Sequence, residues 1–218
     1  MEVSWVYCLF AMTLAYLCGS IPTAVWWGKA FHGVDIREHG SRNAGATNTF
    51  RVLGARAGVP VLLIDILKGF APVRVLPIWS GAEPGSDAWT LLRVLLVITA
   101  VVGHLYPVFA QFRGGKGIAT SLGGILAIHP GAAVVCVGVF TIVFLLSRYV
   151  SLSSLVAALC YPIAVLFIYQ EESRVLLYFS IGMFLLVLFT HRENIGRLWR
   201  GEENRMRLAG QGTNNERS

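Results

Sequence analysis

The chain has 218 residues, of which 55% are hydrophobic and 14% are charged, and its 18 Lys and Arg residues outnumber its 12 Asp and Glu residues. Soluble domains carry about a quarter charged residues, so this composition excludes an ordinary soluble protein and indicates a membrane protein of one domain. The cysteines lie in apolar runs without the spacing of a metal or redox motif, so no disulfide-stabilised scaffold is implied; they are Cys8, Cys18, Cys136 and Cys160.

Seven apolar segments are taken as transmembrane helices, at about 20 residues per span. They cover residues 3–27, 58–79, 89–112, 118–128, 131–146, 151–169 and 175–190. The fourth and fifth are short because Pro130 interrupts a helix inside 118–147, a region too long for one span and too short for two full ones. We therefore predict that two short helices meet at His129. Glu2 precedes the first span and no Lys or Arg does, so we expect a permanent span rather than a cleaved signal peptide.

Basic residues are distributed unevenly among the polar segments that join these spans. Fourteen of the 18 lie in residues 29–56 and 113–116, at Arg148 and after His191, whereas the loops 81–88 and 170–174 are net acidic. The positive-inside rule places the basic segments in the cytoplasm, with the N-terminus outside and the C-terminus inside. Six spans would leave the arginine-rich tail outside, so the distribution favours seven. We predict an all-α integral membrane domain over residues 1–200 and a polar, disordered tail over 201–218.

Three segments rich in hydrogen-bond donors stand at the cytoplasmic ends of these spans. The first contains Ser41, Asn43, Gly45, Thr47, Asn48 and Arg51, the second contains Gly114, Gly115 and Lys116, and the third contains His191 and Asn194. Backbone N–H groups freed by glycine, together with hydroxyl, amide and cationic side chains, form the kind of cradle that binds an anion. Because all three segments face the cytoplasm, we predict one phosphate-binding site at the membrane surface.

Two charged residues lie inside the second span, where ionisable side chains are costly and often functional. Asp65 and Lys68 are one helical turn apart, so they form either a structural ion pair or an arrangement in which Asp65 orients Lys68 toward the anion site. His104, near the cytoplasmic end of the third span, is more typical of a packing residue than of a catalytic base. The glycine turn that ends in Gly117 is not a nucleotide-binding P-loop, because Gly117 replaces the Ser or Thr that such a loop requires.

Motifs of several other enzyme classes are missing. No histidine is followed by Asp at the fifth position, so the His-x-x-x-x-Asp dyad of the soluble-headed glycerolipid acyltransferases is absent, and no nucleophile elbow of the G-x-S-x-G kind occurs. The His, Cys, Asp and Glu residues have no metal-binding spacing, so we expect neither a metal nor another cofactor.

Six short motifs, in this order along the chain, carry a resemblance to a known family. They are Gly19-Ser20-Ile21-Pro22, the stretch from Gly40 to Asn48, Asp65-x-x-Lys68-Gly69, Gly103-His104-x-x-Pro107-Val108-Phe109, the stretch from Phe112 to Gly117, and His191-Arg192-x-Asn194-Ile195-x-Arg197-Leu198. With them the chain resembles the bacterial acyl-phosphate:glycerol-3-phosphate acyltransferases, small multi-pass membrane enzymes of phospholipid synthesis. The resemblance runs from Gly19 to Glu202. It implies transfer of a fatty acyl group from acyl phosphate to the 1-hydroxyl of sn-glycerol 3-phosphate, with lysophosphatidic acid and inorganic phosphate as products.

The resemblance also implies roles for the donor-rich segments. Ser41, Arg51 and Lys116 would hold the phosphate of glycerol 3-phosphate, residues 43–48 would cradle the acyl-phosphate head, and His191 with Asn194 would orient the acceptor hydroxyl. Whether His191 removes the hydroxyl proton or the leaving phosphate accepts it stays open. An activated mixed anhydride needs alignment and charge stabilisation more than a protein nucleophile, which fits the many donors and the missing nucleophile.

These substrates define the expected surroundings of the protein. We expect acyl phosphate and glycerol 3-phosphate as small-molecule partners, the lipid bilayer around the chain, an acyl-phosphate-producing phosphate acyltransferase as a protein partner, and no nucleic acid. We expect the protein in the bacterial cytoplasmic (inner) membrane, with its site facing the cytoplasm. The bilayer would keep the donor's acyl chain out of water. A small phosphate transporter or channel is the alternative, but donors on one side only and the absence of an inverted repeat disfavour it.

Overall fold

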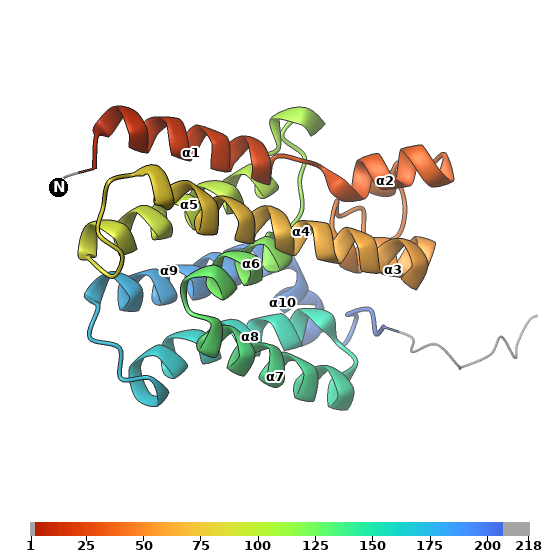
Figure 1. Cartoon of the computed structure of the whole chain (residues 1–218). Coiled ribbons are helices and arrows are strands. Elements are labelled where there is room, and N and C mark those ends of the chain that lie inside the picture. Colours follow the sequence, from red (N-terminus) through yellow and green to blue (C-terminus); the bar gives the residue numbers. More distant parts are fainter. Residues whose placement is uncertain (1–2, 207–218) are drawn as a thin grey trace, which may run out of the picture.

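The computed structural model describes residues 3–206, and over that range the protein is all-helical, without a strand (Figure 1). The α-helices are α1 (Trp5–Gly19), α2 (Thr23–His32), α3 (Ala46–Leu53), α4 (Ala55–Val75), α5 (Asp87–Leu105), α6 (Ile118–Ile128), α7 (Pro130–Ser147), α8 (Val150–Ile163), α9 (Arg174–Thr190) and α10 (Arg192–Trp199). Short helical turns extend or join them: η1 (Ile36–Glu38), η2 (Leu76–Trp79), η3 (Val108–Ala110) and the π-helical η4 (Ala164–Ile168).

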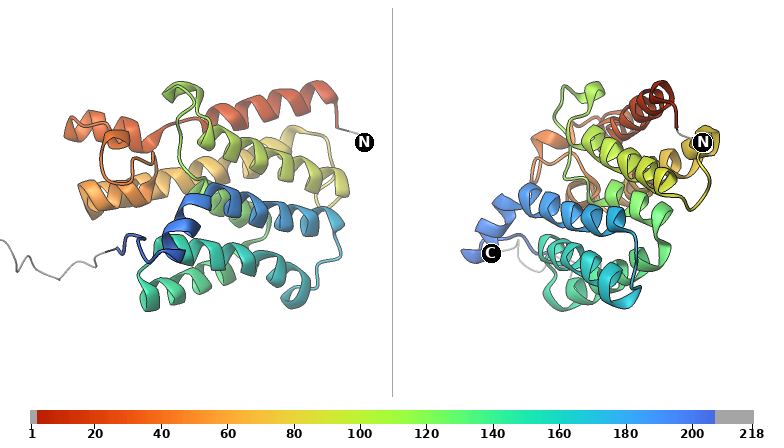
Figure 2. Two further views of the ribbon diagram at one scale, coloured as in Figure 1. Left: turned by 180° about the vertical axis from the view of Figure 1, so that it is seen from behind. Right: turned by 90° about the vertical axis from the view of Figure 1, so that its left-hand side faces the viewer.

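The long helices run side by side, and the short amphipathic ones gather at one end of the bundle. Figures 1 and 2 show α2, α3 and α10 at the same end, whereas the loops that join α4 to α5 and η4 to α9 lie at the other end. The polar segments at the first end come from distant parts of the sequence. The fold therefore brings residues 33–45, 106–117 and 191–206 near one another.

Several helices are long and apolar enough to cross a membrane. Four stretches qualify by length and composition, Trp5–His32, Asp87–Ala110, Pro130–Ser147 and Val150–Ile168, and the number rises to five if α9 and α10, which meet at 62°, are counted together. By length α4 also qualifies, with 21 residues, but its apolar sequence contains Asp65, Lys68 and Arg74, and α6 has only 11 residues. The predicted all-α membrane fold is thus found at this coarser level, and the count of seven spans stays a prediction.

Two proline-containing breaks interrupt the apolar segments. The predicted break at His129 is confirmed: α6 ends at Ile128, and Pro130 occupies the first position of α7, where its missing N–H group is tolerated. His129 caps α7, since its Nδ1 accepts the N–H of Ala132 at 3.1 Å. The predicted span over residues 3–27 falls within one candidate span, Trp5–His32, but its helix is broken, because α1 ends at Gly19 and α2 begins only after Pro22.

Glycines allow the central helices to approach closely. A Cβ atom at Gly69 of α4 would lie 2.0 Å from the carbonyl oxygen of Thr120 in α6, and one at Gly123 of α6 would lie 1.9 Å from that of Ile66 in α4. Such close helix contacts through small residues are typical of membrane bundles, where tight packing takes over the role that burial of apolar surface has in water. The α4–α6 contact fixes the start of α6, and with it the loop that precedes α6.

Candidate functional site

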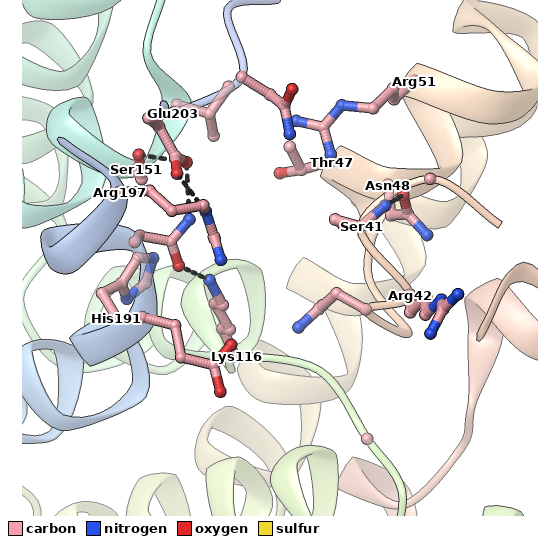
Figure 3. A pocket seen from close by; sticks show the side chains of 17 residues that line it. Ser41, Arg42, Thr47, Asn48, Arg51, Lys116, Ser151, His191, Arg197 and Glu203 are labelled. Atoms are coloured by element: carbon pink, nitrogen blue, oxygen red, sulfur yellow. Dashed lines mark hydrogen bonds and ion pairs between the residues drawn. The ribbon is translucent and has the colours of Figure 1, made fainter. Parts of the chain in front are cut away.

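A polar cavity of about 470 Å³ lies at the end of the bundle that carries α3 and α10 (Figure 3). Its walls come from all three predicted donor-rich segments, together with the start of α8 and the chain after α10. The predicted site residues that line it are Ser41, Asn43, Thr47, Asn48, Arg51, Gly114, Lys116, His191 and Asn194. In Figure 3 the residues of the first segment lie on one side of the cavity and those of α8, α10 and the following chain lie on the other.

Asn48 shapes the first wall. Its side chain is 1% exposed, its Oδ1 accepts the backbone N–H of Ser41 at 2.8 Å, and its Nδ2 donates to the carbonyl oxygens of Ile36 and His39, both at 3.0 Å. Gly40 has φ +59° and leaves no room for a Cβ, which would lie 2.4 Å from the Asn48 Oδ1. These hydrogen bonds of the Asn48 side chain hold the loop against α3. They also keep Ser41 at the edge of the cavity.

Lys116 is positioned by a glycine loop that folds back on the end of α5. The N–H of Gly114 donates to the carbonyl oxygen of Leu105 and that of Gly115 donates to the carbonyl oxygen of His104, each at 3.2 Å. A Cβ at Gly114 would lie 2.0 Å from the His104 oxygen. Only glycine permits this approach, so the loop has one path, and that path brings Lys116 to the cavity.

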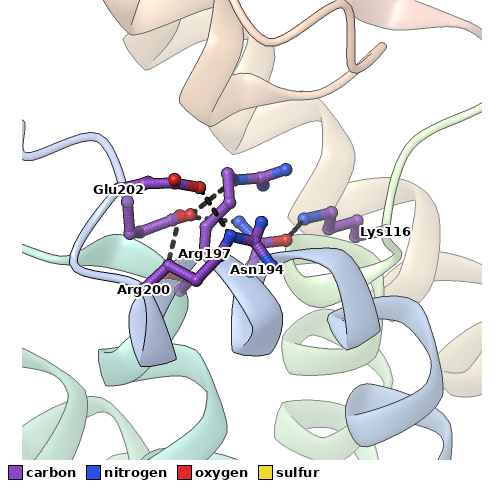
Figure 4. Close-up of polar contacts among 7 residues, drawn as sticks. Lys116, Asn194, Arg197, Arg200 and Glu202 are labelled. Atoms are coloured by element: carbon purple, nitrogen blue, oxygen red, sulfur yellow. Dashed lines mark hydrogen bonds and ion pairs between the residues drawn. The ribbon is translucent and has the colours of Figure 1, made fainter.

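A chain of hydrogen bonds forms the second wall (Figure 4). Lys116 donates to the Oδ1 of Asn194, and the Nδ2 of Asn194 donates to the Oε1 of Glu203 at 2.6 Å. The same Oε1 accepts from the hydroxyl of Ser151 at 2.8 Å, while the Oε2 of Glu203 accepts from the Nε of Arg197 at 2.8 Å. Hydrogen bonds from Arg197, Asn194 and Ser151 outweigh the effect of burial and lower the pKa of Glu203, so the carboxylate holds this network as an anion.

Burial changes the ionisation of Lys116. Removal of the ammonium group from water, with the nearby Arg197 guanidinium adding to the effect, lowers the pKa of Lys116 to about 8. The Glu203 carboxylate opposes this change, and Arg51 across the cavity adds to it. Lys116 is therefore mostly charged at neutral pH, and an anion bound beside it would favour the charged form further.

The geometry of His191 defines which ring nitrogen can act on a ligand. His191 is 3% exposed, and its Nδ1 lies 3.0 Å from the carbonyl oxygen of Val187. A carbonyl oxygen only accepts, so in the neutral ring this hydrogen bond assigns the proton to Nδ1 and leaves a lone pair on Nε2. His191 lines the polar cavity and can accept a hydrogen bond or a proton there through Nε2.

Three predicted site residues do not line the polar cavity. Lys68 is 4% exposed and lies inside the bundle, where its Nζ contacts the Oδ1 of Asp65 at 2.9 Å and donates to the carbonyl oxygen of Ile21 at 2.7 Å. This is the structural ion pair, and not the arrangement in which Lys68 reaches toward the anion site. Gly45 precedes α3 as its N-terminal cap, and Gly115 lines a neighbouring pocket of about 220 Å³.

His104 has the packing position expected for it. It is 6% exposed, and its Nδ1 lies 3.2 Å from the Oγ1 of Thr120. Its other ring nitrogen faces the glycine loop, since a Cβ at Gly115 would lie 2.3 Å from the Nε2 of His104. His104 therefore supports the loop that carries Lys116.

Sequence reasoning missed several residues of the cavity, above all Glu203. This residue falls in the stretch predicted as a disordered tail, yet the described part of that stretch, residues 201–206, includes a carboxylate with three hydrogen-bond donors around it. Residues 207–218 lie outside the described residues, so the predicted domain division stays a prediction. Arg197 could have been found, because it follows Asn194 by one helical turn; nothing in the local sequence around Glu203 points to its role.

A second cavity, of about 430 Å³ and almost wholly apolar, adjoins the polar one. It is lined by residues of α4, α6, α7, α8 and α9. On two helices, residues one turn apart line different cavities. On α8, Ser151 lines the polar cavity and Ser154 lines the apolar one; at the end of α9, His191 lines the polar cavity and Val187 lines the apolar one. An apolar ligand segment can thus lie directly beneath a polar head.

A family model described as "Glycerol-3-phosphate acyltransferase" matches residues 9–201. The chain belongs to the glycerol-3-phosphate acyltransferase family. Curated glycerol-3-phosphate acyltransferases of similar sequence include that of Salinibacter ruber, 42% identical over 207 residues with 89% of this chain and 90% of that protein covered. That of Fusobacterium nucleatum is 40% identical over 202 residues, with 93% and 98% covered.

Two solved structures extend the likeness of this acyltransferase to three dimensions. They are crystal structures of PlsY, an integral membrane glycerol 3-phosphate acyltransferase, in a glycerol 3-phosphate form and a lysophosphatidic acid form. Each is 36% identical to this chain and covers 91% of it and 95% of its own chain, with TM-scores of 0.79 and 0.78. The family resemblance predicted from the motifs is confirmed, and the protein is a bacterial membrane acyltransferase. Within residues 3–206, no group of three or more His, Cys, Asp and Glu side chains could hold a metal ion.

Proposed function

We propose that this acyltransferase moves a fatty acyl group from acyl phosphate to the 1-hydroxyl of sn-glycerol 3-phosphate and releases lysophosphatidic acid and inorganic phosphate, the first acylation of bacterial phospholipid synthesis. The observation that carries the proposal is that residues of a cationic polar cavity lie one helical turn from those of an apolar cavity of about 430 Å³, on α8 and at the end of α9. The names of the relatives and of the solved PlsY structures support the same acceptor and product.

The acceptor's phosphate is bound between the two walls of the polar cavity. Arg51 lies on the first wall and Lys116 on the second, with Ser41 at the edge of the loop that Asn48 folds. A guanidinium, an ammonium and a hydroxyl together suit a phosphate dianion. Arg197 adds a further positive charge close to Lys116.

The acyl donor spans both cavities. Its hydrocarbon chain occupies the apolar cavity, where it avoids contact with water. Its phosphate head lies at the segment from Asn43 to Asn48. This places the reacting carbonyl carbon where the two cavities meet, near His191. Two anionic partners held in this way react as one unit, which removes much of the entropic barrier.

The reaction forms one carbon–oxygen bond and breaks another. The 1-hydroxyl oxygen attacks the carbonyl carbon, the bond from that carbon to the phosphate oxygen breaks, and phosphate leaves. Lys116, which the glycine loop holds at the cavity, stabilises the negative charge that develops. The hydroxyl proton goes either to the Nε2 of His191 or to the leaving phosphate. Turnover by His191→Gln tests the two routes: a large loss supports proton acceptance by His191 or strict orientation of the hydroxyl, and near-normal turnover favours transfer of the proton to phosphate.

The orientation in the membrane follows from charge. We place the chain in the cytoplasmic membrane with seven spans, the N-terminus outside and the polar cavity facing the cytoplasm, where an acyl-phosphate-producing phosphate acyltransferase supplies the donor. Support comes from the clustering of the basic segments at the cavity end of the bundle (Figure 1), opposite the acidic loop around Glu83.

The proposal is tested with purified protein in detergent micelles. Acyl phosphate and glycerol 3-phosphate should give lysophosphatidic acid, detected by thin-layer chromatography, whereas acyl-CoA and acyl-carrier protein should not serve as donors because the His-x-x-x-x-Asp dyad is absent. Comparable turnover with acyl-CoA would refute the donor assignment. Absence of product with every donor would refute acyl transfer itself.

A further inference from the structure

Four buried side chains line the inner end of the apolar cavity, the part that lies farthest along the helices from the polar cavity. Ile125 of α6, Cys136 of α7, Tyr161 of α8 and Met183 of α9 line it and are 8%, 8%, 2% and 4% exposed. All four belong to the main buried apolar cluster of the bundle. They lie about 10–16 Å from the polar cavity along their helices, at 1.5 Å per residue.

The flank of the cavity differs from this end. Val137 and Thr141 of α7 line the cavity and are exposed, and Leu62 and Ile66 of α4, both half-buried, face them across it. In a bilayer these exposed positions meet lipid. An acyl chain can therefore enter the cavity laterally from the membrane. At the inner end, by contrast, the end of the chain contacts the packed core.

Tyr161 makes this inner end rigid. Its ring packs edge to face against Phe179, with ring centroids 6.1 Å apart and planes at 85°. Its hydroxyl has no hydrogen-bond partner among the described residues. A ring fixed in a close-packed core does not move aside without cost, since forcing extra methylene groups into such a core displaces side chains from their rotamers.

We propose that Ile125, Cys136, Tyr161 and Met183 form an end wall that sets the longest acyl chain that the enzyme transfers efficiently. The inference rests on the proposed function, because it takes the apolar cavity as the site of the donor's chain. Because the donor's chain comes from lipid or detergent, each methylene group inside the cavity gains close packing contacts, and a methylene group beyond the wall gains none. Among saturated donors, kcat/KM should therefore rise with length up to a limit and then level off or fall.

Two substitutions should move this limit in opposite directions. Met183→Ala removes side-chain volume from the wall and should shift the chain length with the highest kcat/KM toward longer donors. Ala157→Leu adds volume one helical turn before Tyr161 and should shift the preference toward shorter chains. The measurement is the rate of lysophosphatidic acid formation, by mass spectrometry, from a homologous series of saturated acyl phosphates.

One control variant should leave the profile unchanged. Leu185→Ala makes a similar truncation on α9, two residues from Met183, at a position that is 57% exposed and does not line the cavity. Unaltered chain-length profiles in active Met183→Ala and Ala157→Leu proteins would overturn the end wall. Failure of the wild-type protein to make product from any acyl phosphate would instead overturn the proposed function.

Discussion

Lys116 and Arg51 approach the polar cavity from opposite walls, so each should contribute separately to phosphate binding. Removing one charge-assisted contact from a partly desolvated site costs about 2–4 kcal/mol, or roughly 30- to 1000-fold in rate. Lys116→Ala and Arg51→Ala should each lower kcat/KM for glycerol 3-phosphate by about that factor, measured in steady-state assays on folded protein. Arg51→Lys should restore activity only in part, because an ammonium group lacks the planar fork of guanidinium.

Arg113 provides the matched control for this prediction. It lies on the same glycine loop as Lys116 but is exposed and does not line the cavity. Arg113→Ala should therefore keep kcat/KM close to the wild-type value. Wild-type kinetics for both Lys116→Ala and Arg51→Ala would show that the acceptor's phosphate binds elsewhere.

The lowered pKa of Lys116 predicts a pH dependence. Because burial places this pKa at about 8, the ammonium loses its charge as the pH rises through that value, well before an exposed lysine would. The kcat/KM for glycerol 3-phosphate, which reports on the free enzyme, should therefore fall by up to tenfold per pH unit above about pH 8. Lys116→Arg keeps its charge over this range and should move the fall to higher pH. An identical alkaline limb in both proteins would assign the titration to another group.

At the scale of helices, the glycine contact between α4 and α6 carries a prediction about stability. A methyl group at Gly69 or Gly123 would lie about 2 Å from a carbonyl oxygen of the facing helix, so Gly69→Ala and Gly123→Ala must push the helices apart. Overpacking of this kind costs about 1–3 kcal/mol, or roughly 2–10 °C in Tm. Thermal unfolding in detergent should show this loss.

Gly138 of α7 provides a control, because Gly138→Ala replaces a helical glycine without forcing two helices apart. No atom lies within 4 Å of a Cβ built at this position. Gly138→Ala should therefore leave the Tm unchanged or raise it slightly, because alanine favours the helix. A Tm as low as that of Gly69→Ala would mean that close helix approach is not the cause.

The helices themselves could be predicted well where the sequence carries a local signal. Pro130 marks the break between α6 and α7, and it was predicted at the correct place. Pro22 is a similar signal, but it lies in an apolar run long enough for one span, so the break between α1 and α2 was missed. That break matters for Lys68, whose carbonyl partner at Ile21 is a backbone group freed by the break and distant in sequence.

The candidate site was predictable as a set of donors and not as a network. The residue types and glycines of three segments indicated an anion site, and the fold brings nine of the predicted residues to one cavity. Glu203 could not be predicted, because its role depends on how the chain after α10 turns back toward Ser151 and Asn194. Asn48 lines the cavity as predicted, but the hydrogen bonds by which its amide holds the loop of Ser41 could not be foreseen, because their carbonyl partners depend on the folded path of that loop.

For the whole molecule, the distribution of charge predicts the topology. With all native cysteines replaced by alanine, Glu83→Cys in the loop before α5 should react with an impermeant maleimide on intact cells, and Glu202→Cys after α10 should react only after lysis. A cysteine at Thr213 would probe the same side, but Thr213 lies outside the described residues, whereas Glu202 is described and exposed. Labelling of both positions on intact cells, or of Glu202→Cys alone, would refute an outside N-terminus with seven spans.

The contact of Glu203 with Ser151 and Asn194 also has a consequence for biosynthesis. The first wall of the cavity is complete once residues 40–51 have left the ribosome, but the second wall needs a carboxylate near position 200 of the chain. A nascent chain in the membrane insertion machinery therefore has the first wall of the cavity, with Arg51, but lacks the second wall, which depends on Glu203. We expect acyl transfer to begin only after synthesis has passed Glu203 and the bundle has closed, so a nascent chain that ends before Glu203 should not react with the cell's activated fatty acids.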